Sequence, residues 1–185
     1  MKIRRFLTMA IALVLSLSML AFGQGNTFKR LRYLGGTVAS KTKSDNWDNK
    51  LTVESTGIRL ALKDGGETMI DPKRVTGLSY GQEAHRRVGT MIALGVLLTP
   101  LALFGLMHKK RNHFIGIEYT NADDSKGGVL LQADKDDYRG LLMALRASTG
   151  AKVAVAPDDR KYVPTGIDVI EVEKDKEKKP NDEKK

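Results

Sequence analysis

Short stretches in which apolar and polar residues alternate run through the middle of the chain. The clearest are 50–54, 57–62 and 113–120, and turn-forming residues separate them from their neighbours. Such alternation places side chains on opposite faces of a strand, so that one face can be buried. The pair Gly35 and Gly36 is typical of a bulge or bend within a strand. The pattern predicts seven short antiparallel strands, at 30–40, 50–54, 57–62, 67–70, 74–80, 113–120 and 129–132.

The pattern then changes to that of one amphipathic helix. Acidic residues from Asp134 to Asp137 suit a helix N-terminus, and Gly150 suits its end. The apolar side of the helix is formed by Tyr138, Leu141, Leu142 and Leu145, with Met143 as a further member. We therefore expect a mainly β fold with one helix, in which a seven-stranded antiparallel barrel is capped by the C-terminal helix. Residues 151–156 are expected to add a short strand.

Two short motifs stand within the phrase LTVESTGIRLALKDGGETMIDPKRVTGLSYG. Gly57-Ile58-Arg59-Leu60 follows a turn, and Pro72-Lys73-Arg74-Val75 opens a later strand. With the order of seven strands and then one helix, this region resembles the bacterial pleckstrin-homology-like and GRAM-like domains. The resemblance covers 28–150 and implies a lipid- or protein-binding module without catalytic residues. It implies no phosphoinositide site, because this sequence has no matching basic ligand motif.

The N-terminus has the three parts of a secretory signal. Lys2, Arg4 and Arg5 precede an apolar stretch over 6–20, and small residues lead to Gly23. We expect 1–23 to be a signal peptide cleaved after Gly23, with an uncleaved anchor helix as the alternative. In both cases the rest of the chain leaves the cytoplasm. An exported protein at the outer face of a bacterial inner membrane, or in the periplasm, follows from this interpretation.

A second apolar segment, Val88–Met107, interrupts the predicted strands and departs from the domain pattern. Its 20 residues carry no charge, and as one helix they could cross a bilayer core of about 30 Å. We expect lipid contacts in its middle and headgroup contacts from its basic flanks. The expected lipid contacts are Leu97, Leu98, Leu101, Leu103 and Phe104. The expected headgroup contacts are Arg86, Arg87, Lys109, Lys110 and Arg111.

Three interpretations of this segment remain open. If 74–80 and 113–120 belong to one sheet, both ends of the segment lie on the same side of a membrane. That topology favours an apolar helical hairpin that enters one leaflet or docks on a partner, with Thr99 and Pro100 at the start of its second arm. The alternatives are a single transmembrane span and a helix buried in a soluble core.

Composition and side-chain chemistry reduce the number of possible functions. The chain has 31 Lys and Arg against 22 Asp and Glu, a net charge of +9, and no cysteine. The absence of cysteine excludes disulfides and thiolate chemistry. We expect no metal, because the three histidines lack supporting carboxylates at ligand spacing, and no cofactor. Lys41, Lys43 and Trp47 in the loop after the first strand are the expected contacts for a loop ligand.

These features favour a non-enzymatic binding module. We expect an exported, membrane-associated domain that contacts lipids or a membrane-protein partner and binds no nucleic acid, since its charge gathers beside an apolar segment. The alternative is a structural subunit of an envelope membrane complex, with 88–107 as a transmembrane helix. Residues 151–185 form an extension whose charged end, 174–185, has too few apolar residues to order itself. The sequence sets no oligomeric state.

Overall fold

A computed structural model describes residues 25–41, 43–82 and 112–172. The nine strands are β1 (Asn26–Gly36), β2 (Asn49–Val53), β3 (Ile58–Ala61), β4 (Glu67–Ile70), β5 (Val75–Gly81), β6 (His113–Thr120), β7 (Lys126–Ala133), β8 (Val153–Val155) and β9 (Val169–Glu171). One α-helix, α4 (Tyr138–Thr149), and two 3-10 helices, η2 (Pro72–Arg74) and η3 (Pro157–Tyr162), complete the described elements. The predicted signal peptide, the apolar segment 88–107 with its expected hairpin, and the charged end 174–185 lie outside the described residues.

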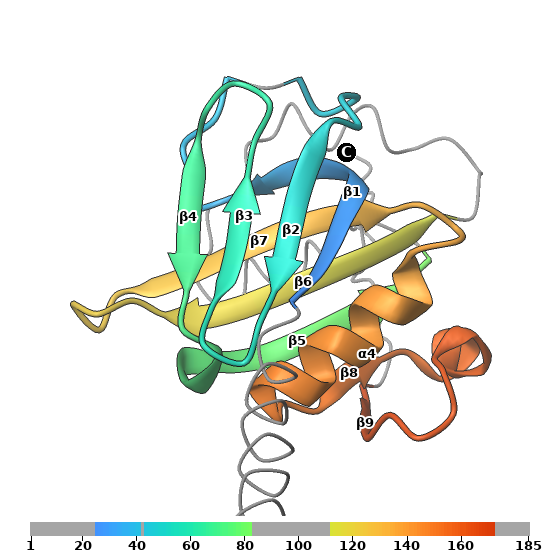
Figure 1. Ribbon diagram of the computed structural model, residues 1–185. Helices are drawn as coiled ribbons and strands as arrows, with labels where there is room; N and C mark the ends of the chain where they lie inside the picture. The colour runs from blue at the N-terminus through green and yellow to red at the C-terminus, as the bar shows by residue number, and fades with distance from the viewer. Residues whose placement is uncertain (1–24, 42, 83–111, 173–185) are drawn as a thin grey trace, which may run out of the picture.

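All nine strands belong to one sheet, in the order β4-β3-β2-β1-β7-β6-β5-β8-β9. The strands β1 to β7 pair antiparallel, whereas β8 pairs parallel with β5 and β9 parallel with β8. The strands at both ends of this order, β4 and β9, are edges, so the sheet is open. Figure 1 shows β2, β3 and β4 running across the direction of β5, β6 and β7, with α4 lying against the sheet.

The prediction of a seven-stranded antiparallel barrel is therefore wrong. The chain after α4 returns along the outer edge of β5, where its backbone pairs through Leu78↔Val153 and Tyr80↔Val155. A further strand then pairs through Val153↔Val169. These two short strands satisfy the hydrogen-bonding edge that barrel closure would have used, and they turn the sheet into a mixed one.

The core lies between the bent sheet and α4. Apolar residues from the strands and from the predicted apolar side of the helix form one buried cluster, which includes Leu31, Leu60, Ile117, Leu131, Leu141, Leu142 and Leu145, each 0% exposed. The side chains of α4 are spaced so that they face this cluster together. Gly150, with φ +68°, ends the helix, and its N–H donates to the carbonyl of Arg146. The predicted helix is confirmed over Tyr138–Thr149, but Met143, expected on its apolar side, is 54% exposed.

Candidate functional site

The loop between β1 and β2 contains the predicted ligand residues. Its start is fixed by the Asp64 carboxylate, which accepts hydrogen bonds from Ser40 Oγ at 3.0 Å and from the Lys41 backbone N–H at 2.5 Å. Lys41 and Lys43 are exposed. Trp47, 37% exposed, lies instead beside Arg32, whose guanidinium carbon is 5.5 Å from the centre of the indole ring. The structure therefore pairs the predicted tryptophan with an arginine of β1.

Arg32 was not predicted as a site residue. Its Nε donates to the carbonyl of Ser44 at 2.6 Å, and its Nη1 donates to Gln132 Oε1 at 3.0 Å. Partial burial lowers the pKa of Arg32, and the nearby Asp45 carboxylate raises it; a guanidinium nevertheless stays charged at neutral pH. Arg32 thus places a fixed positive charge over the ring of the only tryptophan, where the loop meets the sheet.

Three aromatic rings meet at the ends of β5 and β6, and we call Tyr80, His113 and Tyr138 the aromatic cluster. The rings of His113 and Tyr138 are stacked with centroids 3.6 Å apart, and those of Tyr80 and Tyr138 are 5.6 Å apart. The Tyr80 hydroxyl shares a hydrogen bond of 2.8 Å with His113 Nδ1. Arg139 Nε donates to the Tyr138 hydroxyl at 2.9 Å, and that hydroxyl donates to the carbonyl of Tyr162.

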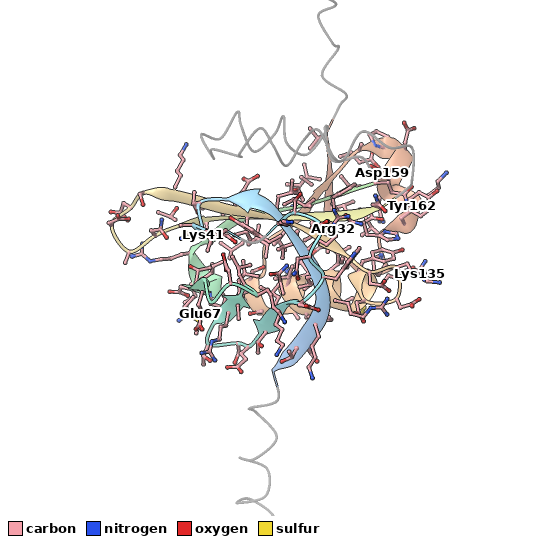
Figure 2. The ribbon with its side chains drawn as sticks, turned by 90° about the horizontal axis from the view of Figure 1, so that it is seen from above. Arg32, Lys41, Glu67, Lys135, Asp159 and Tyr162 are labelled. Carbon is pink, nitrogen blue, oxygen red and sulfur yellow. The ribbon has the colours of Figure 1, made fainter. Side chains whose placement is uncertain are left out.

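This cluster fixes the two points where the chain leaves and re-enters the sheet. Gln82, directly after β5, donates its N–H to the carboxylate of buried Asp159 at 3.3 Å. His113, the first residue of β6, is held by the ring of Tyr138. Figure 2 shows Asp159 and Tyr162 together at one end of the molecule, away from Lys41 and Glu67. The described residues on either side of 83–111 therefore lie at neighbouring, well-packed strand ends.

Burial governs the protonation of this cluster. It lowers the pKa of His113, with a further contribution from Arg139 that is opposed by Asp134. Burial also raises the pKa of Tyr80 well above the usual range for tyrosine, with Tyr138 adding to it. At neutral pH the pair is thus an uncharged imidazole and a protonated phenol.

The lowered pKa of His113 predicts that acid destabilises the protein. Because the folded state disfavours the imidazolium, the unfolded chain binds the proton more readily, and stability falls as the pH drops below the unfolded value of about 6.5. His113→Phe keeps an aromatic ring against Tyr138 but removes the titration. We expect its unfolding free energy, measured in urea at about pH 7.5 and 5.5, to change less between the two pH values than that of the unchanged protein. If the unfolding free energies of the two proteins changed equally between the two pH values, His113 would not be the source of the acid sensitivity.

A cavity of about 380 Å³ opens at the other end of β5. Its lining includes Gly77, Leu78, Glu118, Lys152 and Ile170. Burial raises the pKa of Glu118. Glu118 is the one carboxylate in this lining, so the cavity provides no pair of carboxylates. Among the described residues no group of three or more His, Asp or Glu could hold a metal ion.

The predicted membrane-contacting and headgroup-contacting residues all lie within 83–111, outside the described residues. In the part of the chain that the structure describes, no helix is both long and apolar enough to cross a bilayer. Of the predicted site, the structure therefore describes Lys41, Lys43 and Trp47. It adds Arg32 and the aromatic cluster.

Comparisons with known proteins identify no family. No family model matches the chain, and no curated protein matches it. A solved structure described as the Spt16D Pob3N heterodimer, of the pleckstrin-homology-like fold family, is a weak structural neighbour with a TM-score of 0.41 and 11% sequence identity. The match covers 72% of this chain and spans only 56% of that one. A likeness this weak carries no argument about function.

Proposed function

We propose that this protein is a non-enzymatic, exported binding module of the pleckstrin-homology-like class, held at the outer face of a bacterial inner membrane. Residues 88–107 contact the bilayer, and the domain contacts lipids or a membrane-protein partner. One observation carries the proposal: a charge-free segment of 20 residues interrupts two strands that pair directly with each other, from Val75↔Tyr119 to Gly81↔Phe114.

The pairing of β5 with β6 bears on how the segment meets the membrane. Antiparallel neighbours lie about 4.8 Å apart, so the chain leaves and returns at nearly the same place. A single span between them would put the paired strands on opposite sides of the bilayer. The strand pairing thus supports peripheral or same-side insertion over the alternative of a transmembrane subunit.

The arginine and tryptophan pair supports a position at a membrane surface. Tryptophan combines an apolar ring with a polar N–H, and is enriched where membrane meets water. Arg32 adds a fixed positive charge beside it, and a charge near an anionic surface contributes about 1 kcal/mol.

Membrane association is tested by removing the apolar surface of the segment. We expect Leu97, Leu98, Leu101 and Leu103, all changed to Ser, to move the protein from the sedimenting membrane fraction to the soluble fraction, because each Leu buried in lipid contributes about 2 kcal/mol. A matched control changes Met69 and Met143, which are 63% and 54% exposed, to Ser. The control should sediment like the unchanged protein. Unchanged sedimentation of the four-leucine variant would refute the proposal.

The side of the membrane is tested with single cysteines, since the chain has none of its own. Thr76 and Ala122 are exposed and lie before and after the segment. An impermeant thiol reagent added to spheroplasts should label both Thr76→Cys and Ala122→Cys. Labelling of Thr76→Cys alone would establish a true span and favour the transmembrane subunit.

Trp47 provides a spectroscopic prediction. If it lies at the membrane surface, its fluorescence should shift to shorter wavelength when vesicles containing about 30% anionic lipid are added, and Arg32→Gln should weaken the shift. Because Trp47 is the only tryptophan, the signal reports this loop alone. No shift with a protein that still sediments with the vesicles would place the loop away from the membrane.

A further inference from the structure

The sheet has a second face, which α4 and the core do not use. Strand pairing assigns the residues on it: Ser79, Gly116 and Leu130 are neighbours across β5, β6 and β7, and Gly81, Phe114 and Gln132 form the adjacent row. We call these two rows the outer face. The core-facing residues alternate with them, as Ile115, Ile117, Val129 and Leu131 show.

Two of the six residues of the outer face, Phe114 and Leu130, have large apolar side chains although this face points away from the core. Phe114 and Leu130 are not members of the core cluster, and neither is Leu34 in the bulge of β1. They are nevertheless 2%, 1% and 2% exposed, so water is excluded from this face as well. A sheet with buried apolar side chains on both faces needs a covering layer on each.

The middle of the outer face has small side chains. Ser79 and Gly116 face each other between the larger Leu130 and the neighbouring Phe114. Ser79 is 2% exposed, and in the described part of the chain its hydroxyl has no hydrogen-bond partner. A buried unsatisfied hydroxyl beside apolar side chains indicates that what covers it here is apolar.

The occupant is indicated by where the chain leaves the sheet. Gly81 and Phe114, the residues next to the two ends of 82–113, pair with each other and belong to the outer face. A chain that turns back over this face first meets Phe114 and then the row of Ser79, Gly116 and Leu130. Residues 88–107 are the charge-free segment of the chain between these two residues.

We propose that the outer face is the docking site of residues 88–107 of the same chain. One side of the segment covers Phe114, Leu130 and Ser79. The segment is charge-free and mostly apolar, so its other side needs apolar cover too, and the outer face is thereby turned toward the bilayer. The docking stands by itself, whereas the orientation toward lipid rests on the proposed function.

Photo-crosslinking of the full chain in isolated membranes tests the docking. Benzoylphenylalanine is introduced at Phe114, and adducts are mapped by mass spectrometry after irradiation. The matched control places the same probe at Met143, 54% exposed on α4. We expect adducts within 88–107 of the same chain from the first position and at least tenfold fewer from the second. Adducts with lipid, with another protein or with a second copy of the chain would overturn the proposal.

A second measurement covers the case in which the probe disturbs folding. Ser79→Cys is nearly isosteric, and it can be combined in turn with cysteine at Leu97, Leu98, Leu101 and Leu103. Mild oxidation should give an intrachain disulfide for at least one pair, and Met143→Cys with the same partners should give none. Absence of any disulfide with Ser79→Cys overturns the docking. Sedimentation of the same samples distinguishes failure of the docking from failure of the proposed membrane association. Protein that sediments with membranes but gives no adducts in 88–107 refutes the docking alone.

Discussion

Gly36→Ala should lower the free energy of unfolding by about 3 kcal/mol, because the change combines backbone strain with a clash that cannot relax. Gly36 has φ +146°, which L side chains rarely adopt. An added Cβ would lie 2.2 Å from the carbonyl oxygen of Gly128 and 2.9 Å from Val129 Cα. Both are backbone atoms of the neighbouring strand β7.

The carbonyl of Gly128 is held in place from a second direction. It accepts hydrogen bonds from the backbone N–H of Thr37 at 2.9 Å and from the Thr37 hydroxyl at 3.3 Å. Moving it away from a new methyl group would break these bonds and separate β1 from β7. The clash therefore cannot be relieved by a side-chain rotation.

Gly65→Ala is the matched control for this prediction. Gly65 also has a positive φ, +87°, but an added Cβ would meet no atom within 4 Å. Its cost should be the conformational strain alone, about 1 kcal/mol. Urea unfolding in mild detergent, followed by Trp47 fluorescence, measures both variants. Equal losses for the two would show that strain, and not the contact with β7, sets the cost.

The strand positions were largely readable from the sequence, since each is a local pattern. The strands β4 and β6 coincide with the predicted 67–70 and 113–120, and a register shift between Tyr33 and Gly35 lies beside the predicted glycine bend. Alternation reports which residues share a face. It does not report which strand lies beside which, because pairing joins residues far apart in the chain.

The extension of the open sheet by β8 and β9 was missed for that reason. Val153–Val155 and Val169–Glu171 are three residues each, too short for a periodic signal. Their parallel pairing along β5 follows from the path of the chain after α4, which no local pattern records. A short strand within the predicted 151–156 is confirmed, but its consequence for the sheet was not predictable.

The same limit explains which site residues could be predicted from the sequence. Trp47 could be predicted because it is a lone tryptophan in a polar loop. Arg32 could not, since a cation that alternates with Leu31 and Tyr33 reads as an ordinary solvent-facing position. Only the pairing of Arg32 with Gln132 across β1 and β7 shows what holds its guanidinium.

Asn49 was also missed, and its replacement is the second large effect that we expect. Asn49 is 0% exposed at the start of β2. Its Nδ2 donates to the carbonyls of Leu31 and Asn46, each at 3.0 Å, and its Oδ1 accepts from the backbone N–H of Lys63 at 3.1 Å. One side chain thus joins β1, the Trp47 loop and the turn after β3.

Asn49→Ala should lower the free energy of unfolding by about 3 kcal/mol, because it leaves three backbone groups without their partner in a buried place. Asn49→Asp should destabilise the protein at least as much as Asn49→Ala, since a carboxylate turns a second acceptor toward two carbonyls and adds a buried charge. Lys50→Ala, an exposed change one residue further along β2, should cost less than about 0.5 kcal/mol. Urea unfolding of the three variants gives these differences directly.

Asn49 also connects stability to the loop that we place at the membrane. The carbonyl that its Nδ2 holds belongs to Asn46, the residue directly before Trp47. Without that bond the loop loses its fixed end, and Trp47 should leave Arg32 and become more accessible to acrylamide quenching under conditions where the domain is still folded. If quenching stays unchanged while stability falls, the stacking on Arg32 is sufficient to hold Trp47, and the Arg32 variant should then release it.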